Sequence, residues 1–211
     1  MTRLLLARHG ETAWNREGRV QGWAPTALTD RGETQASALG TWLGEEHTVD
    51  RVVTSDLRRV RETTGRIREA GAVPEATVDR AWRERAFGVY QGFLAEELFE
   101  REPDHAPGDS VSSLDAVPEG AEGIDEFCAR VESAWAGLCE RVDAEETVLL
   151  VTHGGVIKTL LSVVTDRSRT AALSADSPPN CSVTEIRLDG DSATLAELLA
   201  LLADVVEPAG D

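Results

Sequence analysis

The chain has 211 residues, enough for one well-buried domain, and its apolar content of 41% is that of a globular protein. Its formal net charge of −17, from 38 acidic and 21 basic residues, argues against nucleic acid or an anionic membrane as a partner, because both select basic surfaces. No apolar run approaches the roughly 20 residues of a membrane span, and the N-terminus lacks the pattern of a signal peptide. Three scattered cysteines predict neither a disulfide framework nor a zinc site, so we expect a cytoplasmic protein.

Every basic residue except Lys158 is an arginine. A GC-rich genome would explain this bias. Adaptation to high salt is the alternative hypothesis, because a dense carboxylate surface stays hydrated there and its self-repulsion is screened.

The first half of the chain alternates short apolar runs with amphipathic segments. The patterns predict a strand over 2–7, a helix over 31–43 that Thr29 caps and Gly44 ends, a strand over 51–54, a helix over 56–69 that Ser55 caps, a short strand over 76–79 and a helix over 93–101. The intervening segment 84–88 is predicted to be a loop.

The second half contains the clearest helix of the chain, in which apolar residues recur at three- and four-residue steps from Ile124 to Val142. We then expect a strand over 147–152, a helix to about Val164 and a strand over 182–188, followed by a hairpin signal at 189–191. Segment 192–203 fits either a helix or a strand. Repeated strand–helix alternation predicts an α/β fold, a three-layer sandwich whose central sheet is mostly parallel with one antiparallel edge region.

Chemically active residues follow three of the predicted strands. Arg8-His9-Gly10 ends the first strand, Ser55 and an arginine-rich helix follow the second, and His153-Gly154-Gly155 follows the strand over 147–152. Because parallel strands end at one sheet edge, these groups are expected to converge on one crevice. Two imidazoles, several guanidiniums and two helix N-termini are suited to binding a phosphate dianion.

Each feature also has a simpler interpretation. His153 could be a buried structural histidine, the arginine run could be a solvated helix face, and Glu84 could form a surface salt bridge with Arg83 or Arg85. A metal site is the competing interpretation of the two histidines, but neither has carboxylates or cysteines at ligand spacing beside it.

The motifs, taken together, resemble those of the histidine phosphatase superfamily, which includes the cofactor-dependent phosphoglycerate mutases. The matching segments run in the family's order from residue 3 to about 160: Leu6–Thr12 with Trp14-Asn15, Gln21-Gly22, Leu28-Thr29 with Gly32, Thr54–Arg59, Glu84 with Phe87-Gly88 and Gln91-Gly92, and Val151–Gly155. Arg-His-Gly alone would be a weak signal, whereas the ordered set is specific.

The resemblance implies the role of each catalytic residue. His9 would be the nucleophile that forms a phosphohistidine, and Glu84 would be the general acid and base. Arg8, Arg59 and His153 would hold the phosphoryl oxygens. Arg59 is chosen because the second pocket arginine of the family lies four residues after the serine. No metal and no cofactor are implied.

The resemblance also implies a substrate-binding set and an architecture. The expected substrate-binding residues are Asn15, Gln21, Gly22, Phe87 and Gly154. Residues 1–211 would form a single domain, and an excursion at about 93–121 would cap the pocket; its part from Glu102 to Gly120 is rich in Pro, Gly, Ser and Asp. The expected partner is a small phosphomonoester, and a homodimer is the candidate assembly.

Departures from the mutase pattern favour a phosphatase. Where mutases carry a histidine this chain has Ala86, and where they carry the lysine that binds the substrate carboxylate it has Ala95. Between residues 93 and 129 the only permanently cationic residue is Arg101. The expected function is therefore metal-independent hydrolysis of small phosphorylated metabolites. A mutase is the first alternative, and a catalytically silent phosphate-binding regulator is the second.

Overall fold

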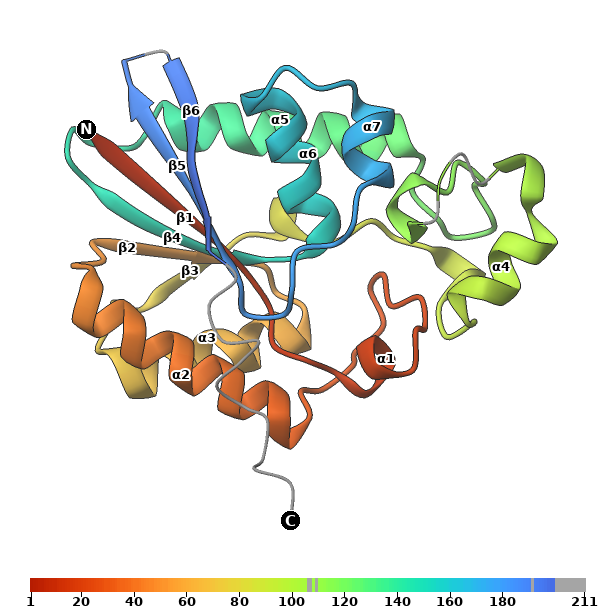
Figure 1. The fold of residues 1–211 in the computed structure, drawn as a ribbon, viewed down its shortest axis with the longest axis horizontal. Helices are drawn as coiled ribbons and strands as arrows, with labels where there is room; N and C mark the ends of the chain where they lie inside the picture. Colours follow the sequence, from red (N-terminus) through yellow and green to blue (C-terminus); the bar gives the residue numbers. More distant parts are fainter. Residues whose placement is uncertain (106–107, 109, 191, 200–211) are drawn as a thin grey trace.

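The computed structural model describes residues 1–105, 108, 110–190 and 192–199. A six-stranded sheet of order β3-β2-β4-β1-β5-β6 crosses its centre (Figure 1). The strands are β1 (Thr2–Arg8), β2 (Arg51–Thr54), β3 (Ala76–Val78), β4 (Thr147–Thr152), β5 (Val183–Asp189) and β6 (Ser192–Leu199). Strands β1 to β4 are parallel, and β5 and β6 are antiparallel, which confirms the predicted mostly parallel sheet with an antiparallel edge region.

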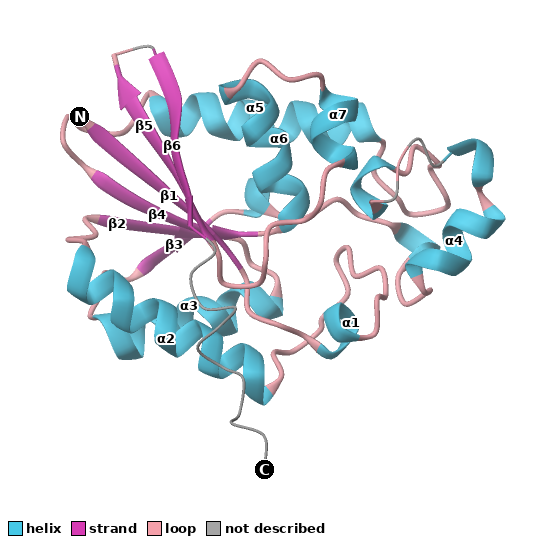
Figure 2. Cartoon of the chain, viewed as in Figure 1, coloured by secondary structure: helices cyan, strands magenta, loops and turns pink. Residues whose placement is uncertain are grey.

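Helices cover both faces of this sheet (Figure 2). Helices α2 and α3 lie on one face, and α5 and α6 lie on the other. The helices are α1 (Ala13–Arg16), α2 (Asp30–Glu46), α3 (Arg58–Gly71), α4 (Ala95–Arg101), α5 (Ile124–Cys139), α6 (Gly154–Val164) and α7 (Arg169–Ser174). The sequence patterns had not indicated the short helices α1 and α7.

Residues Leu4–Ala7 of β1 are buried because helices pack against both faces of the sheet there. Leu4 and Leu6 belong to the hydrophobic cluster that includes residues of α5 and α6. Leu5 and Ala7 belong to the second cluster, which α2 and α3 complete. Truncating one of these leucines to alanine would cost about 2–5 kcal/mol of unfolding free energy, because the surrounding helices leave a cavity.

Several predicted helix boundaries are wrong, and for those of α2 and α3 the structure gives a physical reason. Helix α2 starts after the predicted cap Thr29 but continues past Gly44 to Glu46. A Cβ atom at position 44 would lie 3.0 Å from the carbonyl oxygen of Gly71, so this glycine serves close helix packing. Helix α3 begins at Arg58 with Leu57 as its N-cap, because the hydroxyl of Ser55 bonds His153 instead of capping the helix.

The ambiguous segment 192–203 is a strand as far as it is described. Strand β6 pairs with β5 in an antiparallel hairpin, as the turn signal at 189–191 indicates. Asp191 and residues 200–203 lie outside the described residues. Helix α5 begins at Ile124 as predicted but ends at Cys139, so Val142, the last residue of the apolar pattern, lies beyond the helix.

The segment predicted as an excursion contributes a small hydrophobic cluster of its own. Leu98, Leu114 and Ala116 pack there with Val20 and Phe87, apart from the two clusters on the sheet faces. Helix α4 lies to one side of the sheet, beyond α1 (Figure 1). Among the described helices none is long and apolar enough to cross a bilayer.

Candidate active site

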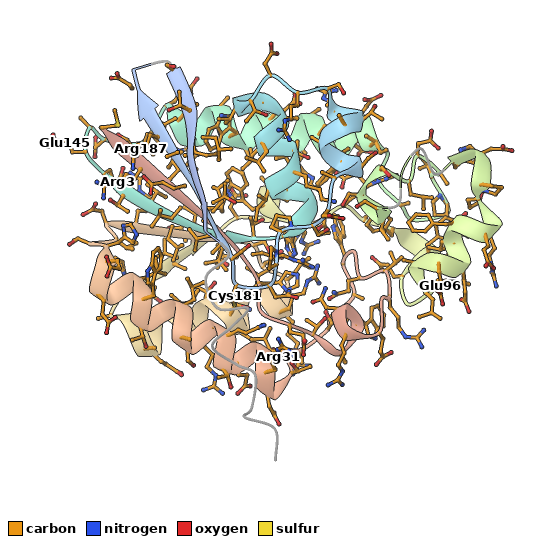
Figure 3. All side chains as sticks on the ribbon, viewed as in Figure 1. Arg3, Arg31, Glu96, Glu145, Cys181 and Arg187 are labelled. Carbon is orange, nitrogen blue, oxygen red and sulfur yellow. The ribbon has the colours of Figure 1, made fainter. Side chains whose placement is uncertain are left out.

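The carboxyl ends of β1 and β4 bring the two predicted histidines together. Arg8 pairs in parallel register with Thr152, so His9 and His153 leave adjacent strands at the same height, with ring centroids 5.4 Å apart. The backbone at Gly10 lies so close to Gly32 that an added Cβ would be 2.5 Å from the Gly32 carbonyl oxygen, so a side chain does not fit at this position. Nitrogen-bearing side chains gather at these strand ends, beside the labelled Cys181 (Figure 3).

The guanidinium of Arg59 lies between the two imidazoles. Its Nε donates to Nε2 of His9 at 3.1 Å, and its Nη2 donates to Nδ1 of His153 at 3.1 Å. Since a guanidinium has no acceptor, both of these ring nitrogens must carry lone pairs. The remaining ring nitrogens then carry the protons: His9 Nδ1 donates to the Gly10 carbonyl at 2.8 Å, and His153 Nε2 donates to Ser55 Oγ at 2.9 Å.

Burial and the neighbouring arginines keep both imidazoles neutral. Desolvation, followed by the charges of Arg59 and Arg8, lowers the pKa of His9 well below 6.5. Desolvation and Arg59 lower the pKa of His153 in the same direction. Burial lowers the pKa of Arg59 to about 10, so this residue is still a cation at neutral pH. His9 therefore has an unprotonated Nε2 at physiological pH.

Arg8 has the features of an anion ligand. Its Nη1 donates to the Pro178 carbonyl, whereas its Nε is buried without a hydrogen-bond partner among the described residues. The N-terminus of α6 is close by, since a Cβ at Gly154 would lie 3.7 Å from Arg8 Nε. A buried, unpartnered guanidinium N–H beside a helix N-terminus is suited to a phosphoryl oxygen.

Glu84 lies at the edge of this cluster and is half-buried. Its Oε2 accepts a hydrogen bond from the Gly155 N–H at 3.0 Å, and its Oε1 accepts one from the Arg85 N–H at 2.9 Å. The simpler interpretation, a salt bridge with Arg83 or Arg85, is wrong. Arg83 instead bonds Asp56 through two contacts of 2.6 Å, and Arg85 donates to backbone carbonyls such as that of Glu122.

All predicted site residues except His153 border one cavity of about 380 Å³, a size that suits a small metabolite. His153 lies behind its wall, bonded to Arg59. The members of the predicted set that line it are Arg8, His9, Asn15, Gln21, Gly22, Arg59, Glu84, Phe87 and Gly154.

Four residues of the substrate-binding set are held by local contacts. The carbonyl of Gly22 accepts from Arg59 Nη2 at 2.8 Å, and Phe87 packs in the small cluster of the excursion. Asn15 Oδ1 accepts from Thr12 N at 3.2 Å as part of a capping box at α1, and Gln21 Oε1 accepts from Thr12 Oγ1 at 3.0 Å. The amides of Asn15 and Gln21 are thus oriented at the cavity wall by the loop that follows β1.

Sequence reasoning missed several groups at this site. Ser55 is a partner of His153, although the spacing suggested a helix cap. Trp23 Nε1 donates to the Glu84 carbonyl at 2.6 Å, and Arg19 lines the cavity. Lys158 of α6 reaches Ser110 in the excursion, a contact that no local pattern could indicate. Among the described residues, no group of three or more His, Cys, Asp or Glu side chains is placed to hold a metal ion.

Comparison with known proteins gives a consistent set of matches. A family model described as the histidine phosphatase superfamily (branch 1) matches residues 4–200. The chain is 34% identical over 194 residues to phosphoglycerate mutase-like protein 4 of Arabidopsis thaliana, covering 91% of this chain and 82% of that protein. It is 33% identical over 174 residues to the metal-independent phosphoserine phosphatase of the same plant, covering 82% and 73%.

Solved structures share the fold. YhfR of Bacillus stearothermophilus has a TM-score of 0.80 at 33% identity, covering 93% of this chain and 96% of that one. A mycobacterial glucosyl-3-phosphoglycerate phosphatase, solved in complex with VO3, has a TM-score of 0.79 at 27% identity, covering 92% and 96%. A structure described as a putative α-ribazole-5′-P phosphatase from Escherichia coli has a TM-score of 0.79 at 29% identity, covering 94% and 97%.

Proposed function

Because the chain belongs to the histidine phosphatase superfamily (branch 1), we propose that it is a metal-independent phosphomonoesterase that hydrolyses small phosphorylated metabolites through a phosphohistidine on His9. The observation that carries the proposal is the bond from Arg59 Nε to His9 Nε2, which requires a lone pair on Nε2 of a histidine that lines the cavity. A neutral imidazole with a fixed tautomer is the form that can attack phosphorus.

In the first half-reaction, His9 Nε2 forms a bond to phosphorus while the ester P–O bond breaks. The attack requires that Arg59 exchange its bond to Nε2 for one to a phosphoryl oxygen. Arg8 and Arg59 would balance the charge on the equatorial oxygens, which is the main requirement of phosphoryl transfer. Glu84, in its protonated form, would give its proton to the departing alkoxide.

In the second half-reaction, water attacks the phosphohistidine. Glu84, now a carboxylate, would take a proton from the water while the water oxygen forms a bond to phosphorus. The P–N bond would break, and its electron pair would return to His9 Nε2. Two backbone N–H groups hold the Glu84 carboxylate, and neither of the neighbouring arginines pairs with it. This placement supports a residue that must act as acid and base in turn.

The composition of the cavity wall supports hydrolysis over the mutase alternative. Ala95 lines the cavity at the position where the resemblance places the carboxylate-binding lysine of mutases, and Ala86 is buried where they carry histidine. A second phosphorylated substrate would find less positive charge in this cavity than in that of a mutase, so water would receive the phosphoryl group.

The cytoplasmic location, the homodimer and the single capped domain remain predictions.

The test is release of inorganic phosphate from a panel of phosphomonoesters, with a chelator present, at low and high salt. We expect release by the wild-type protein and none by His9→Ala. An acid-labile, base-stable phosphoprotein, trapped after rapid mixing and absent from His9→Ala, would identify the intermediate. Phosphate release that survives in His9→Ala would refute the proposed nucleophile. Transfer to phosphoglycerate after priming with 2,3-bisphosphoglycerate, without net phosphate release, would instead establish the mutase.

A further inference from the structure

The single lysine of the chain is buried under the wall of the catalytic cavity and has no role in the chemistry proposed above. Lys158 lies on α6 and is 2% exposed. Its Nζ donates to Ser110 Oγ at 2.7 Å and to the Leu173 carbonyl at 3.2 Å. Among the described residues no carboxylate lies within ion-pair distance of this ammonium. Its shortest hydrogen bond is therefore to a hydroxyl of the excursion that lines the cavity.

The contact with Lys158 fixes the polarity of the Ser110 hydroxyl. An ammonium can only donate, so Ser110 Oγ must accept from it. The backbone N–H of Ser112 also points at Ser110 Oγ, at 3.4 Å. With its lone pairs occupied, the Ser110 hydroxyl has its own O–H left to donate, and the adjacent positive charge strengthens that donor.

We propose that Ser110 is a substrate-binding residue that donates a hydrogen bond to an acceptor oxygen on the leaving group of the phosphomonoester, and that Lys158 is the positioning residue that sets the direction of this bond. The assignment rests on the proposed function, because it concerns the substrate of the same site. It defines a specificity element outside the phosphate-binding cluster. The acceptor could be a neutral hydroxyl or a carboxylate, and the test separates the two.

A purely structural tether is the competing explanation, and the chain offers a control for it. Ser113 Oγ donates to the Ser110 carbonyl at 2.7 Å, so it holds the same turn without touching the Ser110 hydroxyl. Ser113 is buried and does not line the catalytic cavity. Ser113→Ala therefore loosens the turn by one hydrogen bond and leaves the proposed donor in place.

The pH dependence follows from the protonation of Lys158. Burial is the main cause that lowers the pKa of Lys158 to about 8, with Arg8 acting in the same direction and Glu84 and Asp176 opposing it. Arg167 also lines the small cavity that Lys158 borders on its other side. Above about pH 8 the neutral amine can accept the Ser110 O–H, so the hydroxyl would turn from the substrate to Lys158.

The experiment compares kcat/KM for three matched esters: propyl phosphate, glycerol 3-phosphate and 3-phosphoglycerate. The leaving group of propyl phosphate has no further acceptor oxygen. That of glycerol 3-phosphate has neutral hydroxyls, and that of 3-phosphoglycerate has a hydroxyl and a carboxylate. We expect Ser110→Ala to lower kcat/KM for at least one oxygenated ester, relative to propyl phosphate, by about tenfold, the effect of one strong hydrogen bond. Lys158→Met should lower the same ratio, the double variant should show no further loss, and Ser113→Ala should keep the wild-type ratio. The wild-type ratio should fall above about pH 8, and that fall should be absent in Lys158→Met.

If Ser110→Ala lowers kcat/KM equally for all three esters, Ser110 has a structural role and the proposal is overturned. The proposal is also overturned if kcat/KM for the oxygenated esters relative to propyl phosphate does not change. A loss confined to 3-phosphoglycerate would identify a carboxylate as the acceptor, and a loss for both oxygenated esters a hydroxyl. If the wild-type protein hydrolyses none of the esters, the proposed function fails. Calorimetric titration of the same esters into His9→Ala, with and without Ser110→Ala, then decides the assignment of Ser110, because it needs no turnover.

Discussion

The guanidinium of Arg59 links the imidazoles of His9 and His153, at 3.1 Å from His9 Nε2 and 3.1 Å from His153 Nδ1. One buried cation therefore sets the tautomers of both histidines and helps to keep them neutral. This arrangement requires a planar group with several donors, which a lysine ammonium does not provide.

Arg59→Lys should thus fail although it keeps the positive charge. The ammonium cannot reach both imidazoles and the phosphoryl group in the same geometry, so we expect kcat/KM for phenyl phosphate to fall by about 10²- to 10³-fold. Arg58→Lys, one residue earlier on α3 and exposed, is the matched control and should behave as the wild type. Near-wild-type activity of Arg59→Lys would show that charge alone is sufficient.

Glu84→Gln should affect esters according to their leaving group. Because the amide cannot give a proton to an alkoxide, we expect kcat for an alkyl phosphate to fall by about 10²- to 10⁴-fold. For p-nitrophenyl phosphate, whose leaving group needs little protonation, the burst of nitrophenol should persist while the following hydrolysis of the phosphohistidine is slow. Glu96→Gln on α4 is the exposed control, labelled in Figure 3. Equal losses of burst and steady-state rates would argue against the acid–base role.

Gly155→Ala tests the position of the same carboxylate. A methyl group at this position would overlap Glu84 Oε1 and would displace the side chain that Gly155 N holds at 3.0 Å. We expect a loss of activity comparable to that of Glu84→Gln. Gly65→Ala on α3 meets nothing within 4 Å and should raise the unfolding free energy by about 0.5–1 kcal/mol with activity unchanged. Full activity in Gly155→Ala would mean that Glu84 need not occupy the observed position.

The neutral histidines should make stability sensitive to acid. The pKa of His153 is well below 6.5 in the folded protein, whereas the unfolded chain binds the proton near 6.5. The unfolded state thus binds more protons below pH 6.5, and the unfolding free energy falls as the pH falls, by about 1.4 kcal/mol per pH unit for each such imidazole. Urea unfolding between about pH 5 and pH 7.5 should show a shallower slope in His153→Asn than in the wild type. Identical slopes would contradict a buried neutral His153.

High salt should stabilise the protein if the acidic surface reflects adaptation to salt. Exposed ion pairs such as Arg19–Glu17 lose strength as salt rises, but each contributes little. Repulsion within a net charge of −17 acts over the whole surface and is screened at the same time. We therefore expect a higher Tm in about 1 M KCl than in dilute buffer. A maximum of stability in dilute buffer would reject the hypothesis.

The sequence predicted the sheet and the convergence of the two histidines at one sheet edge because their signals are local. Apolar runs such as Leu4–Leu6 mark strands buried on both faces, and Arg8, His9 and His153 directly follow such strands. Parallel pairing then brings them together without further information. The start of α3 was harder to predict, because a serine at position 55 is equally suited to cap the helix and to bond a histidine 98 positions away in the sequence. The contact of Lys158 with Ser110 depends on tertiary packing across 48 positions and leaves no trace in the local pattern.

The small cluster of Val20, Phe87, Leu98, Leu114 and Ala116 has an evolutionary consequence. Because these residues pack mainly with one another and not with the clusters on the sheet faces, substitutions among the neighbouring wall residues need not perturb the strands that carry His9 and His153. A descendant of this chain could accept a different substrate through substitutions at cavity residues such as Ala95 or Val111, with the reaction chemistry unchanged. The part of the chain that selects the substrate could thus change while the part that carries out the reaction stays the same.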